Sequence, residues 1–174
     1  MRLRRLAPPD RGPIERLLRS DGTFQEDEIT VALELIEDAL DRPDLDYRVM
    51  VAADDGGAIL GYVCYGPTPM TLSTWDLYWV ATHSTARGRG VATRLVQAME
   101  TEVHRLGGRT VRIETSQVEA YGSARSLYAR LGYDEAGRIP DFYRPGDDLI
   151  ILAKRLELRA ERDEPAPKAT TLTV

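Results

Sequence analysis

The segment from residue 74 to residue 106 reads TWDLYWVATHSTARGRGVATRLVQAMETEVHRL. Its first part, Trp75–Thr82, is rich in β-branched and aromatic residues and predicts a strand. Its last part, Val91–Leu106, carries apolar residues three and four positions apart, which predicts an amphipathic helix. Gly88 and Gly90 lie between the two parts. The segment therefore predicts a strand, a glycine-containing turn and the start of a helix.

The turn itself, residues 87–92, reads Arg-Gly-Arg-Gly-Val-Ala. N–H groups at the start of a helix have no partner within the helix and lie at the positive end of its dipole. Glycine lets the backbone approach an anion where a Cβ atom would intrude, and Arg87 and Arg89 add positive charge. Because no Gly-Lys-Ser/Thr sequence follows, a Walker-type loop is excluded. We expect a phosphate-bearing small molecule here, although the turn taken alone also fits a helix entry with solvated arginines.

The apolar periodicity of the remaining chain predicts the other elements. Helices are expected at residues 10–19, 26–40 and 120–131, and strands at residues 3–6, 47–54, 59–65, 109–115, 133–139 and 149–156. This order predicts a mixed α/β sheet, antiparallel in its hairpins and parallel where helices cross over. The last residues are rich in Arg, Glu, Pro, Ala and Thr, so we expect one folded domain over residues 1–157 and a disordered tail over residues 158–174.

Composition excludes several classes of function. The chain has 174 residues and a net charge of −5, and this charge disfavours a nucleic-acid partner, which requires a basic surface. The single Cys64 allows no internal disulfide, and with two histidines it cannot build a zinc cluster, so we expect no metal. No apolar run approaches the ~20 residues that cross a bilayer. A reducing, cytoplasmic setting without a membrane partner is expected.

A second motif follows the turn after thirty to forty residues: Ala124, Leu127, Tyr128, Gly132 and Tyr133. Its spacing, the Arg-Gly-Arg-Gly-Val-Ala turn and the order of elements together resemble the GNAT superfamily of acetyl-CoA-dependent N-acetyltransferases. The resemblance covers residues 2–157. It implies a GNAT-like α/β (α+β) fold with a mixed, mostly antiparallel sheet of about seven strands flanked by about four helices.

The resemblance also implies which residues bind the co-substrate acetyl-CoA. Main-chain groups of the strand at residues 80–82 would pair with pantetheine, and the turn would hold the pyrophosphate. Tyr121 replaces the Asn that many members place three residues before the alanine of the second motif, which puts one expected polar contact in doubt. The implied CoA-binding residues are Val80, Ala81, Thr82, Arg87, Gly88, Arg89, Gly90, Val91, Ala92, Tyr121 and Tyr128.

Three residues are candidates for catalysis. The resemblance implies that Tyr128 is the general acid for the departing CoA thiolate, since a phenol can donate a proton to a thiolate. The other interpretation of Tyr128 is a helix aromatic packed in the core. Glu114 and Asp76 are candidates for the base that takes a proton from the amine, directly or through water. Either acid could instead bind the substrate ammonium or be solvated.

The sequence defines the binding site for the amine acceptor less well than the site for acetyl-CoA. The aromatic residues that could line it are Tyr62, Tyr65, Tyr78, Phe142 and Tyr143, of which the Asp141–Tyr143 loop is favoured because specificity often depends on loops. The acidic candidates and the run at residues 26–28 favour a cationic amine. We expect Cys64 to be a small buried hydrophobe and His83 and His104 to be surface residues.

The sequence thus predicts an N-acetyltransferase that moves an acetyl group from acetyl-CoA to a primary amine of an unidentified small molecule or peptide by direct attack. The sequence is also compatible with two alternative functions. One is a non-catalytic acyl-CoA-binding regulatory module, and the other is an interaction or nucleic-acid protein that uses the arginine-containing turn. Longer acyl donors and a homodimer are both compatible with the sequence.

Overall fold

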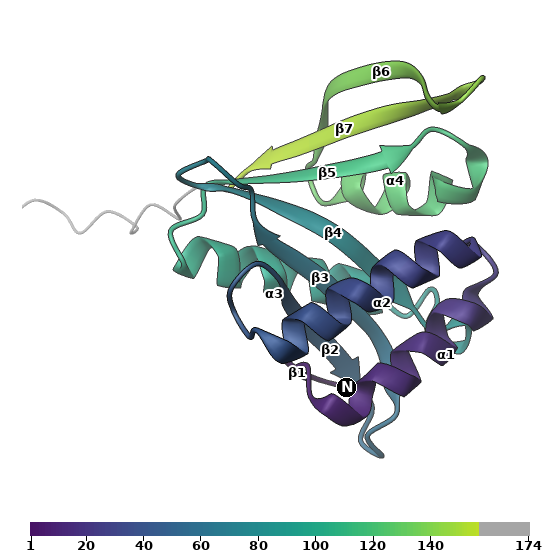
Figure 1. Cartoon of the computed structure of the whole chain (residues 1–174), viewed down its shortest axis with the longest axis vertical. Coiled ribbons are helices and arrows are strands. Elements are labelled where there is room, and N and C mark those ends of the chain that lie inside the picture. Colours follow the sequence, from purple (N-terminus) through teal and green to yellow (C-terminus); the bar gives the residue numbers. More distant parts are fainter. Residues whose placement is uncertain (157–174) are drawn as a thin grey trace, which may run out of the picture.

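The computed structural model describes residues 1–156, so the expected tail at 158–174 lies outside the described residues. The described chain folds into one seven-stranded sheet in the order β1-β2-β3-β4-β5-β7-β6 (Figure 1). The strands are β1 Arg2–Arg5, β2 Arg48–Ala53, β3 Ile59–Pro67, β4 Thr74–Thr82, β5 Thr110–Ser116, β6 Asp134–Arg144 and β7 Asp147–Arg155. Neighbouring strands are antiparallel except for β4 and β5, which are parallel. This architecture confirms the predicted fold class.

Helices cover both faces of the sheet. They are α1 Arg11–Asp21, α2 Glu26–Asp41, α3 Val91–Arg105 and α4 Gly122–Arg130, with short 3-10 turns η1 Pro8–Asp10, η2 Ser84–Ala86 and η3 Glu119–Tyr121. Figure 1 shows α1 and α2 in front of the sheet and α3 behind it. Each face has its own apolar core. Ile14, Leu18 and Ile36 pack in the first core, and Leu95, Met99 and Ile113 pack in the second.

Alternation along β2 explains how one strand supplies both cores. Val49 and Val51 belong to the core under α1 and α2, whereas Ala52 belongs to the core around α3. Successive side chains of a strand point to opposite faces, so an apolar strand can be buried on both sides. The crossover through α3 then carries the chain from β4 to β5, which requires the parallel pairing that the element order predicted.

A β-bulge at Tyr78 separates β4 from β5. Opposite β3, Leu77 pairs with Tyr65 and Trp79 pairs with Cys64, so Tyr78 is an extra residue in β4. The pairing of β4 with β5 stops at the same place, because it runs only from Thr74 to Leu77. A bulge bends its strand and increases the local twist. The carboxyl-terminal half of β4 therefore diverges from β5.

Two predicted boundaries are wrong. The segment 141–143, predicted as a loop, falls within the bounds of β6, which continues to Arg144, although the pairing of β6 with β7 is interrupted between Ile139 and Arg144. Local hydrogen bonds hold this irregular stretch: Asp141, with φ 52°, accepts a bond from the Gly146 N–H at 2.6 Å and its own N–H donates to Asp148 at 3.1 Å. The helix predicted at 120–131 is shorter, because η3 occupies its first turn.

Candidate active site

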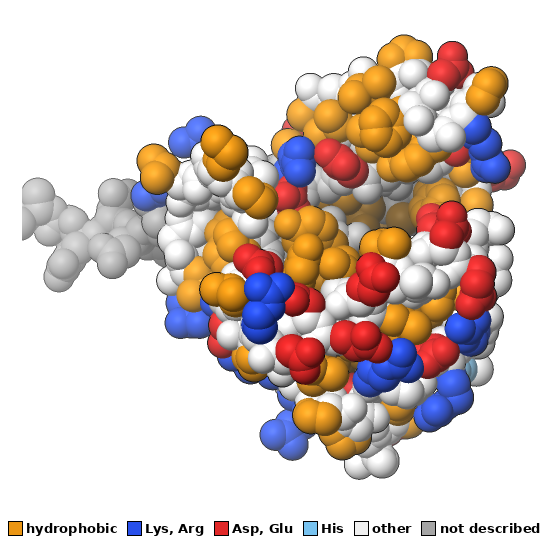
Figure 2. Space-filling view, in the orientation of Figure 1, with side chains coloured by type: hydrophobic (Ala, Val, Ile, Leu, Met, Phe, Trp, Pro, Cys, Tyr) orange, Lys and Arg blue, Asp and Glu red, His pale blue; other side chains and the backbone are white. Residues whose placement is uncertain are grey.

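The divergence of β4 and β5 opens a pocket of about 1350 Å³. Its walls come from the ends of β4 and β5, the start of α3, the η3–α4 segment, the α1–α2 connection and the β6–β7 hairpin. Figure 2 shows the hollow beneath the part of the surface formed by β6 and β7. The predicted residues that line it are Tyr78, Val80, Ala81, Thr82, Arg87, Gly88, Gly90, Val91, Ala92, Glu114, Tyr121, Tyr128 and Tyr143.

The remaining predicted residues do not line this pocket. Asp76 is buried in β4, and Arg89 lies in the turn with its side chain exposed. Tyr62 is completely buried in the core under α1 and α2, and Phe142 is exposed on β6. Tyr65 is buried in the core around α3. Of the aromatic residues that were expected to line the acceptor side, Tyr78 and Tyr143 therefore line the pocket and the other three do not.

The glycine turn has a backbone that suits an anion. Gly88 and Gly90 have φ of 71° and 75°, in the left-handed region that favours glycine. Gly90 is the residue that precedes α3, and within the described chain no side-chain hydrogen bond caps this helix start. The first-turn residues Val91, Ala92 and Thr93 line the pocket. Their N–H groups precede the first intrahelical bond, from the Arg94 N–H to the Gly90 carbonyl, and so suit a phosphate group.

Tyr128 lies near the end of α4 and lines the same pocket. Its side chain is only 4% exposed, and its ring packs edge to face against Tyr133 with centroids 5.8 Å apart. Burial raises the pKa of the Tyr128 phenol above its usual value of about 10, because the phenolate loses its hydration. Tyr128 is therefore protonated at neutral pH and can donate a proton within the pocket.

The two candidate bases lie on either side of one arginine. Arg112 donates from Nε to Asp76 at 2.6 Å, and its terminal nitrogen lies 3.3 Å from Glu114. Asp76 also accepts from the Thr68 hydroxyl at 2.9 Å, so both of its oxygens are occupied. Glu114 is 45% exposed and lines the pocket, whereas Asp76 is buried outside it. Only Glu114 of the two carboxylates lies where an amine in the pocket can reach it.

The end of the pocket away from the glycine turn is acidic and aromatic. Asp27 and Glu28 line it from α2, and Asp147 lines it from the β6–β7 hairpin. Burial, followed by the negative charges of Glu114, Asp147 and Glu28, raises the pKa of Tyr143, so its phenol lies within the electrostatic range of these carboxylates. This end of the pocket favours a positively charged molecule.

Several lining residues were not predicted from the sequence. Asp147 is 5% exposed, accepts a hydrogen bond from Ser116 and lies 3.4 Å from Arg144. Phe24, in the α1–α2 connection, packs on Trp79 with ring centroids 5.7 Å apart. Neither residue belongs to a motif. Only the folding of the hairpin and of the α1–α2 connection over β4 brings them to the pocket.

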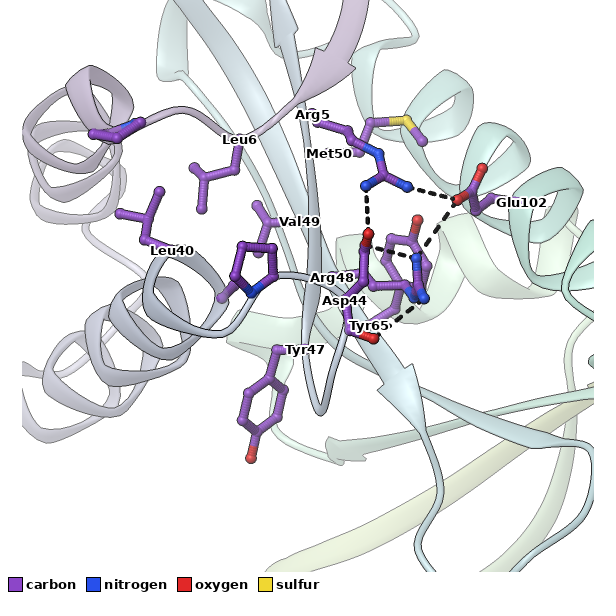
Figure 3. Close-up of a pocket in the computed structure, with 13 residues that line it drawn as sticks. Arg5, Leu6, Leu40, Asp44, Tyr47, Arg48, Val49, Met50, Tyr65 and Glu102 are labelled. Carbon is purple, nitrogen blue, oxygen red and sulfur yellow. Dashed lines mark hydrogen bonds and ion pairs between the residues drawn. The ribbon is translucent and has the colours of Figure 1, made fainter.

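A second, smaller pocket of about 220 Å³ lies between the end of α2 and the start of β2 (Figure 3). Asp44 accepts bonds from Arg5 at 2.6 Å and Arg48 at 2.7 Å, and Glu102 lies 3.5 Å from Arg5. The charges of this pocket therefore neutralise one another. It contains none of the predicted catalytic or CoA-binding residues, so we assign these ion pairs a structural role.

The other reactive side chains are not part of the site. Cys64 is 1% exposed, and burial raises the pKa of its thiol to about 12, as expected of a buried hydrophobe. His83 and His104 are half-buried at the surface. Among residues 1–156, no group of three or more His, Cys, Asp or Glu side chains is arranged to hold a metal ion. Within the same range, no helix is long and apolar enough to span a membrane.

The splayed strand pair, the glycine turn before α3 and the buried tyrosine of α4 define an acyltransferase of the GNAT fold. Residues 46–135 match the family model described as an acetyltransferase (GNAT) domain, and the chain belongs to this family. A crystal structure from Desulfovibrio desulfuricans, assigned to the GNAT family of acetyltransferases, is 34% identical with a TM-score of 0.85. That comparison covers 90% of this chain and 99% of the other.

Two further comparisons concern proteins with named substrates. An aminoglycoside 6′-N-acetyltransferase in complex with coenzyme A shares the fold, with a TM-score of 0.76 at 22% identity over 91% of this chain and 99% of that one. An L-methionine sulfoximine/L-methionine sulfone acetyltransferase of Pseudomonas aeruginosa is 30% identical over 99 residues, which are 54% of this chain and 55% of that protein. The match thus spans about half the length of the curated relatives.

Proposed function

We propose that this protein transfers an acetyl group from acetyl-CoA to the primary amine of a small cationic molecule by direct attack. The observation that carries the proposal is the convergence of three features on one pocket. The glycine turn before α3, the protonated Tyr128 and the half-exposed Glu114 all line it. They correspond to a phosphate cradle, a proton donor and a proton acceptor.

The donor would lie between the diverging ends of β4 and β5. The turn at residues 87–92 and the start of α3 would hold its pyrophosphate through main-chain N–H groups. Pantetheine would extend along the main chain of residues 80–82, which β5 does not pair with. Arg89 would add long-range charge rather than a direct contact, since its side chain is outside the pocket.

The chemical step needs two proton transfers. The neutral amine nitrogen attacks the thioester carbonyl, so a C–N bond forms and the C–S bond breaks. A main-chain N–H near Val80 would stabilise the developing oxyanion. Tyr128 would give its proton to the departing thiolate, and the nitrogen would lose one proton to a base. The products are the acetylated amine and free CoA.

Glu114 is the base that we propose, acting directly or through water, because it lines the pocket and is half exposed. Asp76 would act through Arg112 as a structural partner instead. Its carboxylate is already bound by Arg112 and Thr68, so taking up a proton would break a partly buried ion pair.

We propose that the end of the pocket lined by α2 and the β6–β7 hairpin binds the acceptor and that the acceptor is cationic, because this acceptor end carries Asp27 and Glu28 in addition to Glu114. Asp147 lines the same end but lies beside Arg144. The named relatives act on aminoglycosides and on L-methionine derivatives. An acidic wall favours an acceptor of the first kind, with more than one amine. Glu26 pairs with Arg19 and would not take part. We propose the cytoplasm as the place of the reaction, from cysteine usage alone.

The test is release of free thiol from acetyl-CoA across diamines, polyamines, aminoglycosides, amino acids and peptides. We expect turnover with cationic amines and a lower KM for those with two or more amino groups. Titration of acetyl-CoA by calorimetry, run in parallel, separates binding from turnover. Tight binding without thiol release from any amine would favour a regulatory acyl-CoA-binding module instead.

A further inference from the structure

Tyr121 makes a contact that its place in the second motif does not predict. Its hydroxyl donates a hydrogen bond to Oε1 of Glu28, 93 residues away in the sequence. Tyr121 ends η3, which leads into α4, and Glu28 lies in the first turn of α2. Both side chains line the large pocket. The contact therefore joins the side of the pocket formed by α2 to the side formed by η3 and α4.

The Glu28 carboxylate is held at both oxygens. While Oε1 accepts from Tyr121, Oε2 accepts from the Gln25 N–H at 2.7 Å. Each carboxylate oxygen can accept two hydrogen bonds, so two donors leave capacity for a further one. Glu28 is half-buried, and Tyr143 lies close enough for the charge of Glu28 to act on its phenol. A fixed carboxylate with spare acceptor capacity thus lies at the acceptor end of the pocket.

Resting on the proposed function, we infer that Tyr121 is a positioning residue for the acceptor and not a contact of CoA. Its hydroxyl holds the Glu28 carboxylate in the orientation that binds an ammonium group of the incoming amine. The acceptor would thus carry two amino groups. Glu28 binds the one that does not react, as an ammonium, while Glu114 takes the proton from the one that attacks acetyl-CoA. The pair thereby selects acceptors that carry two amino groups.

The state of the phenol agrees with this role. Burial, together with the hydrogen bond to Glu28 and its charge, raises the pKa of Tyr121. The hydroxyl therefore keeps its proton at neutral pH and remains a donor to the carboxylate. A tyrosine hydroxyl has one proton, and because Tyr121 donates it to Glu28, the hydroxyl cannot at the same time donate a hydrogen bond to CoA.

The experiment measures binding of 1,5-diaminopentane to the CoA-loaded protein by calorimetry. We expect Tyr121→Phe and Glu28→Gln each to weaken diamine binding by about tenfold, because a hydrogen bond to a charged group is lost or an ion pair is removed. In the double variant, Tyr121→Phe should add no further loss, since it acts through Glu28. The affinity for CoA should not change in any of the three.

Two matched controls separate this role from a structural one. Tyr47→Phe removes a hydroxyl from another half-buried tyrosine, outside the large pocket. Glu26→Gln removes the same charge from the same helix turn, also outside that pocket. Both controls should bind the diamine as the wild type does. Tyr121→Asn, which restores the residue common in the family, should behave like Tyr121→Phe toward the diamine.

The inference is overturned if Tyr121→Phe weakens CoA binding and leaves diamine binding unchanged, or if the CoA-loaded wild type does not bind the diamine. Thiol release is measured in parallel on the same protein preparations, with acetyl-CoA in place of CoA. If the diamine binds in a Tyr121-dependent way but no amine releases thiol, the positioning role stands and the proposed acetyl transfer fails.

Discussion

Tyr128 and Tyr133 pack edge to face at the end of α4, with an angle of 63° between the ring planes. The Tyr133 N–H also donates to the Tyr128 carbonyl at 3.0 Å, which closes the helix. Both the ring and the main chain of Tyr128 are therefore fixed by one neighbour. A proton donor on a rigid element holds its geometry better than one on a loop. Because packing holds the ring, a mutation that removes only the Tyr128 hydroxyl should leave the ring in place.

Tyr128→Phe keeps the ring packing and removes the proton donor. We expect kcat to fall by about 100-fold, the order of a general-acid contribution, while the melting temperature changes little. Steady-state thiol release and thermal unfolding are the measurements. Tyr133→Phe is the matched control, since Tyr133 lies outside the pocket, and it should retain full kcat. Equal activity of both variants would remove Tyr128 from the mechanism.

The alkaline limb of the wild-type pH profile tests the same group. Because burial raises the pKa of Tyr128 above about 10, the phenol stays protonated from pH 6 to pH 9. We therefore expect no loss of kcat from this residue in that range. A decline of kcat near pH 8 that disappears in Tyr128→Phe would contradict the raised pKa.

Gly90 and Gly107 flank α3, and both have positive φ, 75° and 86°. Alanine at either position costs about 1 kcal/mol of stability, because an L-residue with a Cβ is strained there. Only Gly90 lines the pocket. We expect Gly90→Ala to weaken acetyl-CoA binding about tenfold and Gly107→Ala to leave it unchanged, as measured by calorimetry. If both variants lose affinity equally, stability of α3 and not the turn explains the effect.

Glu114 and Asp76 both contact Arg112, but we expect different effects when the charge of one or the other is removed by mutation. Glu114→Gln should lower kcat/KM by about 100-fold near neutral pH with little loss of stability, as expected for a half-exposed base. Asp76→Asn should lower the free energy of unfolding by about 2 kcal/mol, since it removes the charge of a carboxylate in a partly buried pair with Arg112. Its kcat should remain within a few-fold of wild type. The opposite pattern would assign the base to Asp76.

Asp10 provides a test of acid stability away from the site. Its carboxylate accepts two bonds from Arg4, at 2.6 and 2.8 Å, and one from the Ala7 N–H at 2.8 Å. Although burial raises the pKa of Asp10, the bonds from Arg4 and Ala7 lower it overall. The stabilisation is therefore complete above the unfolded-state pKa of about 4 and is lost as the pH falls through the lower folded-state value.

We expect Asp10→Asn to lower stability by about 2 kcal/mol at pH 7, the order of charged hydrogen bonds lost at a partly buried pair. The difference from the wild type should shrink as the pH falls below about 4. Denaturant unfolding at pH 7, 5, 4 and 3 provides the curve. A difference that is constant over this range would mean that Asp10 contributes through packing and not through its charge.

Much of the fold followed from local patterns. The helix at 91–106 has a strong apolar periodicity and ends at glycine, so its prediction differed from α3 by one residue. The hairpin tip was harder to predict. Asp141 has a positive φ and its carboxylate binds the Gly146 N–H, and the pairing of β6 with β7 is interrupted between Ile139 and Arg144 where a loop was predicted.

The sequence by itself determined the family motifs, the element order and the glycine turn, because each depends on residues within one or two turns of chain. Only the tertiary structure decided which carboxylate faces the pocket. Asp76 and Glu114 lie on neighbouring strands, and their burial depends on where the Tyr78 bulge ends the pairing of β4 with β5. The contact of Tyr121 with Glu28 joins segments 93 residues apart. Such a contact exists only after α2 and α4 have packed on the sheet, so no local pattern encodes it.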